Sequence, residues 1–299
     1  MDNVISVLES RGPLIGKELA LACRMDTFNA WKKCTGSELI LTRIVSKRYL
    51  RLDAKVEDFA RLSPSIMREF LNYTVVGLPD QAGKINERAK ILTSEITSIS
   101  RKKIELARES VGRLIDNHKE RDLIHKNTCF IIAGDVVFNM AHSEPRPESS
   151  TGELVKGSDL DIICVTENLP PGLDDELDDL FYREKYNLLM NPAQKEELDY
   201  VIKDLSLVSE QLQFNDFKKM VASKILAEGL YLYGSRSLFA RIKKMVETAG
   251  IPGIIRSLEI KAVRDRVLAE QSLLEADEKW NKSALMALFY TTEEKEEIF

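Results

Sequence analysis

The first fifty residues place apolar side chains at helical spacing and then form two runs rich in β-branched and aromatic residues. The helical stretches are VISVLES, GPLIGKELALACRMD and TFNAWKKCTG; the third has Asp26 or Thr27 as its N-cap and ends near Gly36. The two β-rich runs, ELILTRIV and RYLRLD, are joined at Ser46-Lys47. The pattern therefore predicts three helices followed by a β-hairpin.

This order of elements is typical of a winged helix-turn-helix, with TFNAWKKC as the recognition helix and VSKRY as the tip of the wing. The cations that would face the phosphates of DNA or RNA are Lys32, Lys33, Lys47 and Arg48. Residues 1–60 hold ten Lys or Arg against eight Asp or Glu, which is only a small positive excess. A winged helix that contacts protein or acts as a spacer therefore stays an alternative to nucleic-acid binding.

Two longer segments follow. Residues 54–78 are interrupted at Ser63-Pro64 and at Gly77-Leu78, so we expect them to connect the first module to the rest of the chain. Residues 80–127 contain few helix-breaking residues and repeat apolar positions at helical spacing. They predict one amphipathic helix, or two, packed against a core through one face.

The middle of the chain alternates short apolar runs with helices and a loop. CFIIAG (129–134) predicts a buried strand, DVVFNMA a short helix, and the Pro-, Ser- and Glu-rich residues 142–157 a loop. SDLDIICV predicts a second strand, residues 174–190 a helix, and DYVI a third strand.

Two aspartates open the second of these strands. Because side chains alternate along a strand, Asp159 and Asp161 share one face, where their charges repel unless a cation intervenes. Mg²⁺ prefers carboxylate and phosphate oxygens as ligands. Asp199 begins the third strand and would complete a triad if the two strands are neighbours. The sequence therefore predicts a site for a divalent metal and a phosphate.

Residues 110–245 resemble the DNA polymerase β-type nucleotidyltransferase superfamily, because they contain the motifs GSDLDIICV and ELDYVI. The shared features are a Gly-Ser turn, Ser-Asp-x-Asp on a strand, and a later aspartate on a neighbouring strand. ILAEGLYLYGS (225–235) also resembles the stretch that follows the third carboxylate in many small members. We therefore expect an α+β chain: an N-terminal winged helix, a long helical linker, a mixed catalytic sheet with flanking helices, and a helical C-terminal part.

The resemblance implies transfer of a nucleoside monophosphate from an NTP, with ATP the expected one, to an acceptor hydroxyl, with release of pyrophosphate. Asp159 and Asp161 would hold two Mg²⁺ ions, for which Mn²⁺ can substitute. Asp199 would bind the metal that activates the acceptor and would take its proton. The expected nucleotide contacts are Gly134, Asp135, Gly157, Ser158, Arg146 and Lys156.

Two features depart from the family pattern. Asp135 stands where the family has serine, and its charge beside a triphosphate is unfavourable unless it turns away or helps to hold metal. The loop at residues 142–157 also makes the segment longer than in small members. Arg146 or Lys156 would offset the charge of Asp135 by reaching a phosphate, and a solvated insertion is the alternative.

Residues 237–299 predict helices, separated near Gly250 and Pro252. Apolar residues expected in the core of this part are Trp280, Leu285, Leu288 and Phe289. The expected domains are residues 1–78, 79–128, 129–236 and 237–299.

Composition limits the class of protein. The 299 residues are 44% hydrophobic and 30% charged, which excludes wholesale disorder. No apolar run approaches the ~20 residues that span a bilayer, and MDNVISVLES lacks the features of a secretory signal, so we expect a cytoplasmic protein without a membrane partner. The four scattered cysteines predict neither disulfides nor a zinc site. With a net charge of −5, any nucleic-acid contact must be local.

A metal-dependent nucleotidyltransferase is the function that these patterns favour, with a nucleic-acid end, a protein side chain or a small molecule as acceptor. The alternative is a winged-helix DNA-binding regulator whose nucleotidyltransferase fold only senses nucleotide, and the Asp135 departure keeps it open. A glycosyltransferase or phosphatase with an Asp-x-Asp motif ranks lower. Here the apolar strand follows the pair instead of preceding it, and a third carboxylate is present.

Overall fold

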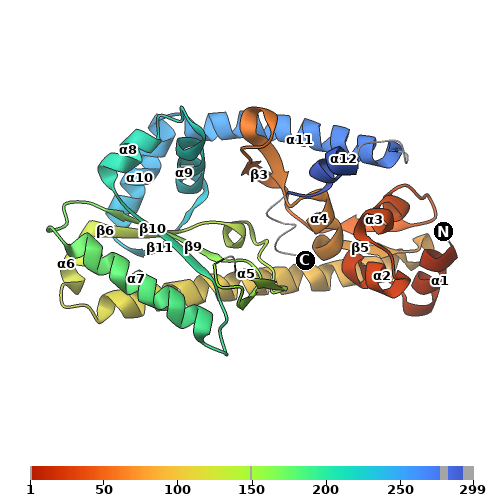
Figure 1. Cartoon of the computed structure of the whole chain (residues 1–299), viewed down its shortest axis with the longest axis horizontal. Coiled ribbons are helices and arrows are strands. Elements are labelled where there is room, and N and C mark those ends of the chain that lie inside the picture. The colour runs from red at the N-terminus through yellow and green to blue at the C-terminus, as the bar shows by residue number, and fades with distance from the viewer. Residues whose placement is uncertain (1, 149, 277–281, 292–299) are drawn as a thin grey trace. The chain divides into compact units, whose positions relative to one another are not determined.

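The computed structural model describes residues 2–148, 150–276 and 282–291. Figure 1 shows helices mixed with strands, and the strands of the described residues form four small sheets, which confirms the α+β class. The chain divides into two units, residues 1–95 with 258–299 and residues 96–257. The helices α5 (Ala82–Asp116) and α11 (Ile251–Glu275) each contribute to both units. The division therefore falls inside helices and differs from the boundaries expected at residues 78, 128 and 236.

The first unit begins with the three predicted helices, α1 (Asp2–Arg11), α2 (Gly16–Cys23) and α3 (Thr27–Thr35). Asp26 caps α3 as expected, because its side chain accepts a hydrogen bond from the amide of Asn29. The later elements of this unit are β1 (Leu14–Ile15), β2 (Leu41–Ile44), β3 (Tyr49–Leu52), η1 (Glu57–Phe59), β4 (Ala60–Ser63), α4 (Ile66–Tyr73), β5 (Thr74–Gly77), η2 (Pro79–Gln81) and α12 (Lys282–Phe289).

The predicted hairpin between the two β-rich runs is wrong. β2 pairs with β5, and β3 pairs with β4, so the two runs lie in different sheets. The reason is the segment 54–78, which we expected to be a connector. It supplies β4, α4 and β5, and Val75 and Val76 of β5 are fully buried. β2 therefore pairs with β5, whose buried apolar side chains stabilise the pairing, instead of with β3. Residues 39–53 thus do not form the wing of a winged helix.

The C-terminal helix α12 packs into the same core. Leu285 and Phe289 are buried among residues of α1, α3 and α4, as expected, whereas Leu288 is exposed. Trp280 lies outside the described residues.

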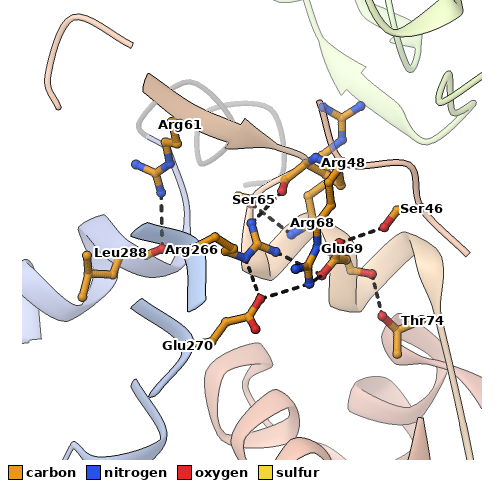
Figure 2. Close-up of polar contacts among 11 residues, drawn as sticks. Ser46, Arg48, Arg61, Ser65, Arg68, Glu69, Thr74, Arg266, Glu270 and Leu288 are labelled. Atoms are coloured by element: carbon orange, nitrogen blue, oxygen red, sulfur yellow. Dashed lines mark hydrogen bonds and ion pairs between the residues drawn. The ribbon is translucent and has the colours of Figure 1, made fainter. Parts of the chain in front are cut away.

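A buried ion network centres on Glu69 of α4 (Figure 2). Its carboxylate accepts hydrogen bonds from Arg48 Nη2 at 2.6 Å, Ser46 Oγ at 2.8 Å and Arg266 Nη2 at 3.0 Å. Arg266 of α11 also donates to Glu270 Oε1 at 2.7 Å. The network therefore ties α11 to α4 and to the segment before β3, which are far apart in sequence.

The charges of this network favour the ionised form of Glu69. Burial alone would raise the pKa of Glu69, but the hydrogen bond from Arg48 and the charges of Arg266 and Arg48 outweigh it, so the pKa is lowered. The same contacts occupy Arg48, one of the cations that we expected to face nucleic acid.

The second unit is built on a four-stranded sheet in the order β10-β9-β6-β11, in which β10 and β9 are parallel and the other pairs antiparallel. Helices α5 and α7 cover one face of the sheet, and α8, α9 and α10 cover the other (Figure 1). Its elements after α5 are α6 (Arg121–Asn127), β6 (Thr128–Ile132), η3 (Asp135–Phe138), β7 (Pro145–Pro147), β8 (Leu154–Lys156), β9 (Leu160–Thr166), α7 (Leu173–Met190), β10 (Leu198–Asp204), α8 (Leu205–Gln211), α9 (Phe217–Glu228), β11 (Leu230–Gly234) and α10 (Arg236–Thr248).

Most predicted elements of this unit are confirmed. The three strands and the helix near 174–190 all form, and residues 80–127 form two helices, one of the two alternatives expected there. The loop expected at residues 142–157 is wrong in part, because β7 and β8 pair in it as a short antiparallel hairpin. Two prolines flank Arg146 in β7, and proline is tolerated there because the pair has no further strand beside it.

We expect Glu69→Gln to lower the free energy of unfolding at neutral pH by ~3–5 kcal/mol, because it removes the buried carboxylate that pairs with the buried Arg266 and the half-buried Arg48. The folded-state pKa is lowered, so the stabilisation is present above the ordinary pKa of 4.5 and is lost as the pH falls below it. Urea unfolding of both proteins at several pH values measures this. Glu270→Gln, at a side chain 28% exposed, is the control and should cost less. Equal stability of wild type and Glu69→Gln at neutral pH would contradict the role of the network.

Candidate functional site

The predicted carboxylates meet at one end of the four-stranded sheet. Asp161 of β9 lies directly opposite Asp199 of β10 in the parallel register, and Asp159 precedes β9 by one residue. The strand β6 ends beside them, where the amide of Ala133 donates to the carbonyl of Asp161 at 3.0 Å. The expectation that the second and third strands are neighbours is therefore confirmed.

Gly134 leaves room for one of these carboxylates. Its φ is +74°, and a Cβ placed on it would lie 2.1 Å from Oδ2 of Asp161. Only glycine fits a position with both constraints. The helix after it, η3, is a four-residue 3₁₀ turn, shorter than the helix predicted over DVVFNMA. The role that the structure gives Gly134 is to let Asp161 approach the end of β6.

The carboxylates are half-buried and act on one another. Burial, followed by the charges of Asp159, Asp199 and Asp135, raises the pKa of Asp161 well above its usual range. Burial also raises the pKa of Asp159, and Asp135 and Asp199 add to the shift, although the charge of Arg146 opposes it. The ionised forms therefore cost folding free energy unless a cation compensates them.

Arg146 reaches this cluster from the β7–β8 hairpin. Its Nε donates to the carbonyl of Gly157 at 2.7 Å, and its Nη2 lies 2.8 Å from a carboxylate oxygen of Glu197. Arg146 is 8% exposed. It therefore links the Gly-Ser turn to the residue two before Asp199, in contacts that differ from the phosphate contact we expected.

The other residues predicted to contact nucleotide are in contact with neighbouring residues of the protein. Lys156 donates from Nζ to the carbonyl of Ala193 at 2.6 Å. Ser158 Oγ donates to Asp135 Oδ2 at 3.3 Å, so the unexpected carboxylate at position 135 faces the Gly-Ser turn. Gly157 has a φ of +64°, and a Cβ there would lie 2.0 Å from the carbonyl oxygen of His142.

Sequence reasoning missed three charged residues around the site. Lys185 of α7 donates from Nζ to Asp199 Oδ1 at 2.7 Å. Lys103 of α5 forms a buried ion pair with Glu196 and donates to the carbonyl of Lys156 at 2.8 Å. The one signal in the sequence is the pair Glu196 and Glu197, which stands just ahead of Leu198 and Asp199. Nothing in the sequence places Lys103 or Lys185 beside them.

The carboxylate oxygens of the site suit a hard cation. Asp159 and Asp161 are half-buried and have raised pKa values, and a bound divalent ion would stabilise their ionised forms. Over the described ranges, however, no three histidine, cysteine, aspartate or glutamate side chains converge as ligands of a single ion. Asp199 would have to exchange its bond to Lys185 for the metal. Asp159 and Asp161 are thus the primary candidate ligands.

The cations predicted for nucleic acid in the first unit differ in their surroundings. Lys32 donates from Nζ to the carbonyl of Ala276 at 2.5 Å, and Arg48 belongs to the network of Glu69. Lys33 and Lys47 have exposed side chains. The basic surface is therefore smaller than the sequence predicted.

No protein-family model matches the chain, and no curated protein matches it significantly. The likeness to nucleotidyltransferases therefore rests on the motifs of the sequence. Among the helices of the described residues, none has both the length and the hydropathy needed to cross a bilayer.

We expect Gly134→Ala to destabilise the protein by ~2–4 kcal/mol, through the left-handed backbone and the collision with Asp161. Gly152→Ala is the matched control. Its φ is +73°, but a Cβ there meets nothing within 4 Å, so it should cost only ~1–2 kcal/mol. Chemical unfolding compares the two. The collision is refuted if both variants lose the same stability.

Proposed function

We propose that this protein is a metal-dependent nucleotidyltransferase that moves a nucleoside monophosphate from an NTP to an acceptor hydroxyl. The observation that supports the proposal best is the parallel pairing that brings Asp161 opposite Asp199, with Asp159 at the entry of the same strand. This arrangement agrees with the Ser-Asp-x-Asp motif and the later strand aspartate of the resemblance.

Each residue has a role that follows from its surroundings. Asp159 and Asp161 would hold Mg²⁺, which, when bound, supplies charge neutralisation and a Lewis acid for the phosphates. Asp199, with a side chain 48% exposed, is the group accessible to an acceptor and would take the proton of its hydroxyl. Lys185 holds the carboxylate of Asp199 in place through their hydrogen bond, and Arg146 holds the Gly-Ser turn beside Asp159.

One observation favours the second candidate, a regulator that only senses nucleotide. Lys185 already bonds to Asp199, and this contact competes with a metal for the third carboxylate. If Lys185 never releases Asp199, the site can bind nucleotide through Asp159 and Asp161 without transferring it. Binding of DNA or RNA through residues 1–78 belongs to either function and stays a prediction that rests mainly on Lys33 and Lys47.

Incubation with each α-labelled NTP and Mg²⁺, in the presence of a cell lysate, separates the two functions. Transfer of label to any acceptor, with release of pyrophosphate, supports the enzyme. Nucleotide-dependent stabilisation without transfer supports the sensor. No stabilisation by any NTP with Mg²⁺ or Mn²⁺ would remove the basis of both.

We expect Asp161→Asn to abolish transfer and the thermal shift caused by Mg²⁺ with NTP. In EDTA at neutral pH the variant should unfold at the same temperature as wild type or a higher one, because it removes a carboxylate whose pKa is raised in the fold. That gain is absent below the ordinary pKa of 3.8, where the carboxyl is neutral in the unfolded chain too. Asp179→Asn, at an exposed position of α7, is the control and should change neither property. Undiminished transfer by Asp161→Asn would exclude it as a metal ligand.

A further inference from the structure

A polar hollow lies in the second unit, with a volume of about 690 Å³. It is formed by α6, by Tyr231 and Gly234 of β11, and by the start of α10. The residues that line it with charged or hydroxyl groups are Asp122, His125, Lys126, Tyr231, Ser235, Arg236 and Ser237. None of these residues has a place in the proposed transfer reaction.

This hollow is separate from the carboxylate cluster. β11 runs antiparallel to β6, with Leu230 opposite Ile132 at the carboxylate end and Gly234 opposite Cys129 at the other end. Each strand residue advances the chain by ~3.3 Å, so the two ends lie on the order of 15 Å apart. A ligand in the hollow would therefore not touch Asp161.

The charge of the hollow is positive and largely uncompensated. Lys126 and Arg236 are exposed, and within the described residues no carboxylate pairs with either. Asp122 is the one acidic residue of the lining, and its carboxylate lies 3.7 Å from Arg121. His125 contributes an imidazole to the same lining. An anion is the ligand that this balance of charges attracts.

The arginine is held in position by an aromatic ring. The guanidinium of Arg236 stacks over Tyr231 at 4.3 Å from the ring centroid, and the Tyr231 hydroxyl donates to the carbonyl of Gly234 at 2.7 Å. Beside it, the hydroxyls of Ser235 and Ser237 lie 3.0 Å apart. This cation–π contact restrains the arginine side chain, which lowers the entropy lost on binding.

We propose that this hollow binds a phosphate group, with Lys126 and Arg236 as its charged contacts and Ser235 and Ser237 as hydrogen-bond donors. Arginine and lysine together with hydroxyl groups are the side chains that recognise phosphate oxygens. The group could belong to a free polyphosphate or to the backbone of a nucleic acid, since both present the same oxygens. The proposal does not depend on nucleotidyl transfer.

The test uses the full-length protein in EDTA, where the carboxylate cluster has no metal and repels an anion. Two probes are titrated by calorimetry: inorganic pyrophosphate, and a short oligothymidylate at several salt concentrations. The variant is Lys126→Glu with Arg236→Glu, and Lys126→Gln alone is the milder second variant. Lys102→Glu, at an exposed position of α5, is the matched control for a reversed surface charge. Thermal unfolding shows whether each variant is folded.

We expect the double variant to bind the preferred probe at least tenfold more weakly, Lys126→Gln to bind it several-fold more weakly, and the control to bind like wild type. Loss of pyrophosphate binding identifies a free phosphate ligand. If only the oligonucleotide binds, with a salt slope that falls by ~0.7 for each cation removed, the ligand is a nucleic-acid backbone. The proposal is overturned if wild type binds neither probe, or if the variants that fold bind as tightly as wild type.

Discussion

The parallel pairing of β9 with β10 is the constraint on which the candidate site depends. It places Asp161 opposite Asp199, and their backbones cannot move apart without breaking the sheet. The surrounding contacts follow from that repulsion. Arg146 lies close enough to oppose the raised pKa of Asp159, Lys185 bonds to Asp199, and Gly134 gives Asp161 the space that any other residue would fill.

The cations beside these carboxylates do not neutralise them fully. Arg146 also pairs with Glu197, and Lys185 bonds to Asp199 from the exposed side of the cluster. The pKa values of Asp159 and Asp161 therefore stay raised in the folded protein. In the first unit the balance is the reverse, because Arg48 and Arg266 outweigh the burial of Glu69 and lower its pKa. The first unit thus compensates the buried charge of Glu69 with its own arginines. The second unit leaves Asp159 and Asp161 without full compensation, and a bound cation would stabilise their ionised forms.

Local patterns in the sequence predicted the helices and strands well, but they predicted the pairing of strands and the contacts between elements less well. The strands at Phe130, Asp161 and Tyr200 and the helix between the last two were evident, because each is a continuous apolar or periodic run with clear ends. The false hairpin arose because two β-rich runs with a short connection look the same whether they pair with each other or with later strands. Residues 54–78 were predicted to be a linker because Ser63-Pro64 and Gly77 interrupt them. The runs between these interruptions are in fact buried elements of the first unit. The partners of Lys103 and Lys185, contributed by helices, depend on packing that no spacing in the sequence reveals.

Groups whose pKa values are strongly shifted by their surroundings tend to gather where a protein binds or reacts, since folding alone gains nothing from them. By that criterion the end of the β9–β10 pair is the best candidate in the described chain, because burial and like charge act there together. The ion network of Glu69 is equally polar, but every charge in it has a partner, and it connects three segments of one core. A structural role accounts for that network completely. Stability alone does not account for the carboxylates, because uncompensated like charges at a half-buried strand end lower it.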